Sequence, residues 1–171
     1  KISPISKEDV IEEFGKKIKF VLNGGRCKIG LESTIIDLSN KPKILRQGII
    51  VKDQIQKILK KSVNISKNPR NIKAPGQLKL HYYPGIPVFI NRSYPRKNAA
   101  FITFGKSFKN SKNYFNLSKS GNLNEAANKL YQVMRKIKNK KYKVIDVCKI
   151  PDIGVGLAIN ERLKKASYKW K

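Results

Sequence analysis

A break rich in proline and glycine divides this chain and most constrains what it can fold into. A Pro-Gly pair such as Pro75-Gly76 can continue neither a helix nor a central strand, so we expect folded parts on either side. The segment also holds the only histidine, His81, followed by Tyr82 and Tyr83. Flexible linkers are usually featureless and rich in Gly and Ser. We therefore interpret residues 63–86 as a linker whose side chains can bind a ligand.

The part after the break has the pattern of a small α/β domain. Strand-like runs at 87–90, 99–104 and 143–147 alternate with a helix that begins at Asn122 and a last helix after Gly154-Val155-Gly156. This alternation predicts a parallel-type sheet over residues 87–171. The Gly-Val-Gly turn is half of a dinucleotide-binding fingerprint, but the third glycine and the acidic ribose partner are missing. A tight turn with close packing is the alternative.

The part before the break, residues 1–62, offers little apolar mass. We expect a helix capped by Ser6 and ended by Gly15, strands at 18–22, 33–38 and 43–46, and a helix near 52–61. So few residues bury only a modest share of their surface. We therefore expect this part to be the end of a larger domain whose beginning lies outside these 171 residues.

Composition narrows the function classes. No window approaches the roughly 20 apolar residues that a membrane span needs, so we expect no membrane contact. Cys27 and Cys148 lie far apart without metal-ligand spacing, which favours a reducing, cytoplasmic setting and argues against a zinc site. The net charge is +27, and residues 63–171 hold 24 basic and 4 acidic residues. This excess indicates a nucleic-acid surface or simply a lysine-biased composition, since Lys outnumbers Arg 31 to 7.

Three short stretches carry side chains suited to ligand chemistry. Ser33, at the mouth of a strand, could offer its hydroxyl to a carboxylate or phosphate, or could satisfy local backbone. Arg46, at a strand end beside Gly48, could form a forked contact with a phosphate or a surface ion pair. The tyrosines after His81 could stack on a base as part of a lid, or could pin the linker to the domain surfaces.

The order of several motifs is more specific than any one of them. They are Ser-Pro at 3–4, Gly-Leu-Glu-Ser-Thr-Ile at 30–35, Leu-Arg-Gln-Gly at 45–48, Ala-Pro-Gly at 74–76 and His-Tyr-Tyr-Pro at 81–84. Together they resemble the threonylcarbamoyl-AMP synthase family. The second half agrees, because Asn-Glu-Ala-Ala at 124–127 and Gly-Val-Gly-Leu-Ala-Ile-Asn-Glu-Arg-Leu at 154–163 are similar to that family's C-terminal domain.

The resemblance implies both fold and activity. It implies the C-terminal part of a YrdC-like α/β domain, a linker, and a small Rossmann-like α/β domain. It also implies synthesis of L-threonylcarbamoyladenylate from L-threonine, bicarbonate and ATP, with release of pyrophosphate, for threonylcarbamoyladenosine modification of tRNA. The carboxylated threonine amine attacks the α-phosphorus of ATP, and magnesium accompanies ATP. Such a displacement needs positioning and charge neutralisation more than a protein nucleophile.

The resemblance also implies roles for single residues. Ser33 contacts threonine, Arg46 binds an ATP phosphate, Ser3 lies on the ATP side, and Tyr82 reaches the nucleotide as the linker closes. His81 docks the linker. The family's Lys-x-Arg motif does not occur in this sequence, and its Ser-x-Asn motif belongs to a region upstream of the part that this sequence resembles. We therefore expect a C-terminal fragment that is inactive alone. A second class stays open, namely a basic α/β module that binds tRNA or a partner protein of the modification pathway.

Overall fold

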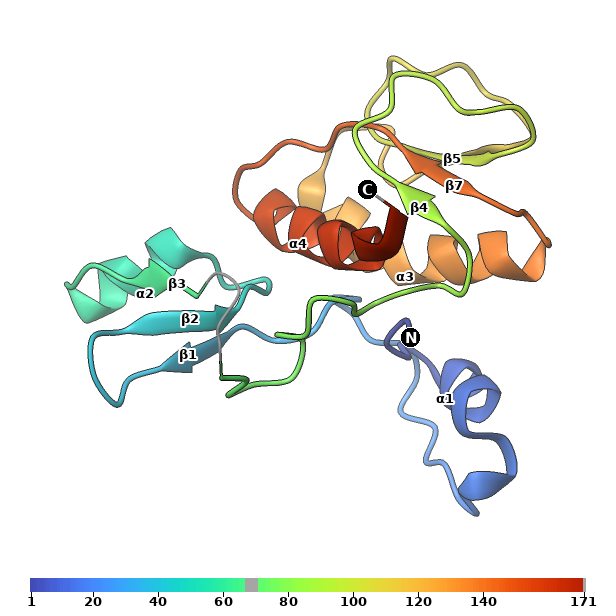
Figure 1. Cartoon of the computed structure of the whole chain (residues 1–171). Coiled ribbons are helices and arrows are strands. Elements are labelled where there is room, and N and C mark those ends of the chain that lie inside the picture. The colour runs from blue at the N-terminus through green and yellow to red at the C-terminus, as the bar shows by residue number, and fades with distance from the viewer. Residues whose placement is uncertain (67–70, 171) are drawn as a thin grey trace.

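The computed structural model describes residues 1–66 and 71–170 and contains two separate β-sheets (Figure 1). The helices are α1 (Lys7–Phe14), α2 (Lys52–Leu59), α3 (Leu123–Asn139) and α4 (Gly156–Ala166), with single 3₁₀ turns at Gly15–Lys17 and Tyr168–Trp170. The strands are β1 (Ile35–Asp37), β2 (Lys43–Arg46), β3 (Asn64–Ile65), β4 (Val88–Phe89), β5 (Ala100–Thr103), β6 (Tyr114–Asn116) and β7 (Ile145–Val147). Among the described helices, none has the length and apolar character needed to cross a bilayer.

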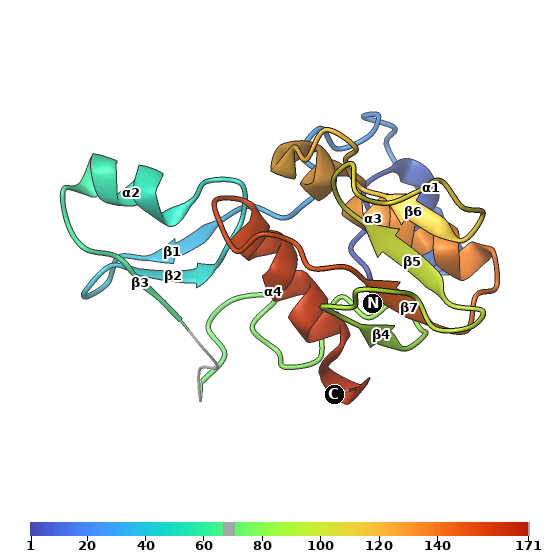
Figure 2. The same ribbon diagram turned by 90° about the horizontal axis from the view of Figure 1, so that it is seen from above.

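The first sheet is small and has the order β1-β2-β3. Strands β1 and β2 are antiparallel, with Ile35 opposite Arg46, whereas β2 and β3 are parallel. Helix α2 lies over one face of this sheet (Figure 2). Strand β3 falls inside the range predicted as linker, so the first sheet continues to Ile65.

The second sheet confirms the predicted parallel α/β unit. Its order is β4-β7-β5-β6, and all three neighbouring pairs are parallel. Helices α3 and α4 contact each other and share one buried apolar cluster with the strands, formed in part by Leu130, Met134, Ile102 and Ile159. Strand β5 is buried along its whole length, as expected for a strand covered on both faces.

Local capping signals place two helices as predicted. The Ser6 hydroxyl accepts the Asp9 N–H at the start of α1, and Gly15 ends that helix with a φ of 52°. The Asn122 side chain accepts the N–H groups of Asn124 and Glu125 at the start of α3. Such caps satisfy backbone donors that a helix end leaves unpaired.

The N-terminal residues pack on the C-terminal domain. Ile2 and Ile5 belong to the same apolar cluster as the second sheet. The Arg135 side chain of α3, only 6% exposed, donates to the Ile2 carbonyl at 2.8 Å and lies 3.4 Å from the Asp9 carboxylate. Residues before and after the linker are therefore held together by one core.

The strand predicted at 18–22 is wrong. These residues form no strand, and the side chains of Phe20 and Leu22 are 90% and 96% exposed. A strand needs a neighbour that pairs with its N–H and C=O groups. Among the described residues, no strand pairs with this segment, so its β-forming sequence does not become a strand.

Candidate functional site

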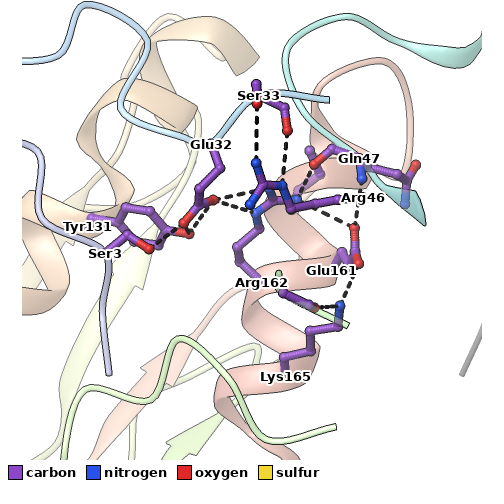
Figure 3. Close-up of polar contacts among 11 residues, drawn as sticks. Ser3, Glu32, Ser33, Arg46, Gln47, Tyr131, Glu161, Arg162 and Lys165 are labelled. Atoms are coloured by element: carbon purple, nitrogen blue, oxygen red, sulfur yellow. Dashed lines mark hydrogen bonds and ion pairs between the residues drawn. The ribbon is translucent and has the colours of Figure 1, made fainter. Parts of the chain in front are cut away.

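The carboxylate of Glu32 lies where the N-terminal part meets α3 and α4 (Figure 3). Arg162 of α4 donates to it through Nε at 3.2 Å and Nη2 at 3.1 Å. The Tyr131 hydroxyl of α3 lies 3.0 Å from both of its oxygens, and the Ser3 hydroxyl also donates to it. We call Ser3, Glu32, Tyr131 and Arg162 the Glu32 cluster.

Arg162 is the central cation of this cluster. Its side chain is 1% exposed, and a buried charge is tolerated only when it is paired and hydrogen-bonded. Besides Glu32, it donates to the Gln47 carbonyl and to the Ala158 carbonyl at 3.4 Å. Glu161 adds a second carboxylate 3.4 Å away. One guanidinium thus binds residue 32 and residue 47 at once.

Ser33 follows Glu32 and Arg46 precedes Gln47, and these two residues contact each other. Arg46 donates through Nε to the Ser33 carbonyl at 3.0 Å and through Nη2 to the Ser33 hydroxyl at 3.2 Å. Ser33 is exposed and Arg46 is half-buried, so a ligand can reach both. The structure therefore brings together the residues predicted to bind threonine and phosphate, and a cation beside a hydroxyl suits a carboxylate or phosphate oxygen.

Tyr82 approaches the same place from the linker. Its ring is 1% exposed, stacks on Tyr131 with centroids 5.9 Å apart, and lies 5.4 Å from the Arg162 guanidinium carbon. Burial raises the pKa of Tyr82 to about 12, so its hydroxyl stays protonated at neutral pH. In this conformation Tyr82 is part of the domain core.

The linker backbone comes close to Tyr82 and Arg46 at Gly76. A Cβ added to Gly76, which has a φ of +87°, would lie 2.5 Å from the Tyr82 hydroxyl and 3.1 Å from Cδ of Arg46. Lys165 of α4 donates to the Gly76 carbonyl. Tyr82 itself has a φ of 58°, a conformation uncommon for residues other than glycine. The linker is thus held tightly against α4 and the Arg46 side chain.

His81, predicted to dock the linker, packs its ring edge against Tyr82 with centroids 4.1 Å apart. Its Nδ1 is buried and has no hydrogen-bond partner among the described residues. Burial and the nearby positive charges of Lys165 and Arg162 lower the pKa of His81. The side chain is therefore neutral at pH 7.

The electrostatics of Glu32 reflect two opposing effects. Burial disfavours the carboxylate, but the hydrogen bond from Ser3 and the charge of Arg162 outweigh it, so the pKa of Glu32 lies below its usual value. Burial and the Glu32 charge raise the pKa of Tyr131. The cluster therefore holds an ionised carboxylate between two neutral hydroxyls and one guanidinium.

Glu32, Tyr131 and Arg162 received no functional role from the sequence, although two of them lie inside the motifs that carry the resemblance. One signal could have found Arg162. Arginine accounts for only 7 of the 38 basic residues, and a chain that uses lysine for general charge keeps arginine where a planar fork is needed.

The fold and the site define a two-part α/β chain whose linker and C-terminal domain enclose a cluster of charged and hydroxyl side chains. A family model described as the C-terminal domain of threonylcarbamoyl-AMP synthase matches residues 50–167, and one described as telomere recombination matches residues 1–48. The chain belongs to the threonylcarbamoyl-AMP synthase family.

Individual relatives agree with this assignment. The chain is 30% identical over 187 residues to the threonylcarbamoyl-AMP synthases of Pyrococcus abyssi and of Bacillus subtilis, covering 98% of this chain and 54% of each relative. A crystal structure of P. abyssi Sua5 complexed with L-threonine matches with a TM-score of 0.83 at 29% identity, again over 98% of this chain and 54% of that one.

A second structure of the P. abyssi protein, with a histidine and the adjacent tyrosine replaced by alanine, matches with a TM-score of 0.80 at 27% identity and the same coverage. The chain spans about half the length of the curated relatives it matches.

Proposed function

We propose that this chain supplies the linker and phosphate side of an L-threonylcarbamoyladenylate synthase. The observation that carries the proposal is the Arg46–Ser33 pair, which is accessible to ligand and is backed by the Glu32 cluster with its buried Tyr131 and Arg162. The family assignment and the threonine-bound state of the P. abyssi neighbour support threonine as one substrate. The other two substrates are bicarbonate and ATP, and magnesium accompanies the ATP. The product serves tRNA modification in the cytoplasm.

The proposed division of labour follows from the side chains present. Ser33 directs its hydroxyl to the threonine carboxylate, and Arg46 neutralises a phosphate of ATP, for which a guanidinium fork is well suited. Ser3 stays on the ATP side, where its contact with Glu32 fixes the N-terminal segment. Tyr82 meets the nucleotide after leaving Tyr131, and His81 moves with it as the docking residue of the linker. Attack of the carbamate on the α-phosphorus then requires only orientation and charge neutralisation.

Because the chain covers 54% of its relatives, we propose that it is inactive alone. The test is a chimera that joins residues 1–171 to the part of the P. abyssi protein that the match leaves uncovered. We expect threonine- and bicarbonate-dependent release of pyrophosphate from ATP by the chimera and none by the isolated chain. In the chimera, Arg46→Ala and Ser33→Ala should lower the rate, whereas Lys57→Ala on α2 should not. A chimera that is folded by circular dichroism yet neither binds threonine nor releases pyrophosphate contradicts the proposal.

The net charge of +27 favours a second candidate, a basic module that binds tRNA or a partner protein without catalysis. Affinity of this kind falls steeply with salt because phosphate contacts release counterions. Tight RNA binding that depends on salt and is unchanged by Arg46→Ala would favour the module over the synthase.

A further inference from the structure

One face of the second sheet carries no helix. Along β5, Ala100 and Ile102 belong to the cluster shared with α3 and α4, whereas the equally buried Phe101 does not. Side chains alternate along a strand, so Phe101 points to the opposite face. There the connections from β4 to β5 and from β5 to β6 arch over the sheet (Figure 1).

These two connections border an open surface pocket of about 370 Å³, within the size range of small-molecule sites. We call it the loop pocket. Three serines, three aromatic residues and one lysine line it: Ser93, Tyr94, Ser107, Phe108, Lys109, Ser111 and Tyr114. None of these residues belongs to the Glu32 cluster or to the Arg46–Ser33 pair.

Phe101 of β5 packs against two of the pocket's rings, Phe108 and Tyr114. The buried Phe101 ring meets Phe108 edge-to-face at 5.5 Å and Tyr114 at 5.2 Å, a preferred geometry for aromatic pairs. Both outer rings remain partly exposed. Tyr94, from the other connection, is 79% exposed. The pocket therefore has three accessible aromatic rings, and two of them, Phe108 and Tyr114, are held in position by Phe101.

The connections themselves are also fixed. The Arg96 N–H donates to the buried Asp146 carboxylate at 2.7 Å, and the Arg96 guanidinium covers the Phe89 ring at 3.4 Å. The Asn113 amide of the second connection donates to the Ala99 carbonyl of the first at 2.9 Å. A site built in this way loses little conformational entropy on binding.

The charge around the pocket has one sign. Residues 91–114 contain six basic and no acidic residues, and Asp146 partners only Arg96 of these among the described ion pairs. Lys109 lies in the lining. Accessible rings beside cations and hydroxyl donors suit a flat base joined to a phosphate.

We propose that the loop pocket binds a nucleotide unit, with the base stacked on Tyr94 and Phe108 and the phosphate held by Lys109 and the serine hydroxyls. The unit comes from single-stranded RNA or from a free nucleotide, which share this chemistry. The site goes beyond the synthase activity and does not depend on it.

The test is fluorescence polarisation of a labelled single-stranded RNA of roughly 12 nucleotides, within the range that such sites cover, with AMP as competitor. Tyr94→Ala should weaken binding by roughly 5- to 150-fold, the loss typical of one stacked base. Lys109→Ala should reduce the slope of log affinity against log salt by about one. Since Tyr94 is 79% exposed, its loss should leave the fold intact, which thermal melting checks.

Phe20→Ala is the matched control, because that ring is 90% exposed and lies outside the pocket. Displacement by AMP assigns the site to a free nucleotide, and binding of the strand without AMP competition assigns it to RNA. The proposal is overturned if neither probe binds, if Tyr94→Ala and Phe20→Ala have equal effects, or if duplex RNA binds as well as the single strand with no effect of Tyr94→Ala.

Discussion

Replacement of Arg162 by methionine tests the Glu32 cluster most directly. The change removes the donors to Glu32 at 3.1 and 3.2 Å and the donor to the Gln47 carbonyl, while methionine keeps most of the apolar stem. Breaking a buried ion pair on one side costs about 3–5 kcal/mol. Glu32 is 18% exposed and keeps its two hydroxyl donors, so we expect about 3 kcal/mol, the lower end of that range.

Urea denaturation of the 171-residue chain measures this loss. In R162M the urea concentration at the unfolding midpoint should fall, while the slope of unfolding free energy against urea concentration stays the same. Arg92→Met is the matched control, because Arg92 is exposed and surface changes usually stay within about 0.5 kcal/mol. The double variant E32Q/R162M should be more stable than R162M alone, since an amide needs no counter-ion. A loss below about 1 kcal/mol for R162M, or no recovery in the double variant, would refute the assigned role of this ion pair.

Three further predictions concern pH, the linker and the thiols. The pKa of Glu32 is lower in the folded chain than its unfolded-state value of 4.5. Ionised Glu32 therefore stabilises the fold above pH 4.5, and this stabilisation is lost as the pH falls through the folded-state pKa. The urea midpoints of wild type and Glu32→Gln should converge in acid and separate above about pH 5. Gly76→Ala should lower the melting temperature, because the added Cβ meets the Tyr82 hydroxyl at 2.5 Å and the φ is +87°; an unchanged melting temperature would show that the linker moves aside. A disulfide reagent at pH 8 should modify the exposed Cys27 at once and Cys148 only on unfolding, because burial raises the pKa of Cys148 to about 11; two fast equivalents would contradict this.

The helix ends that could be predicted from the sequence are those fixed by residues a few positions away. Ser6 and Gly15 bound α1 through contacts within a few positions, and Asn122 starts α3 in the same way. Residues 18–22 have an equally strong strand pattern, but a strand also needs a partner, which local sequence does not show. The strand prediction failed there for that reason.

The candidate site also combines residues that local sequence identifies with contacts that depend on distant parts of the chain. Ser33 and Arg46 were selected separately, for different ligands, and their contact follows from the antiparallel register that places Ile35 opposite Arg46. The cluster behind them depends on Arg162, which is 130 positions from Glu32 in the chain. No spacing rule reaches that far, although the scarcity of arginine was a usable signal.

The position of Arg162 gives the C-terminal domain a direct part in the geometry of the candidate site. Its guanidinium binds Glu32, the neighbour of Ser33, and the carbonyl of Gln47, the neighbour of Arg46. A shift of α4 would therefore move both halves of the Arg46–Ser33 pair, and would also disturb Gly76 through Lys165. All three contacts originate on Arg162 and Lys165, within about one turn of one helix, so any movement of the linker at Gly76 has to break or carry with it a contact to α4.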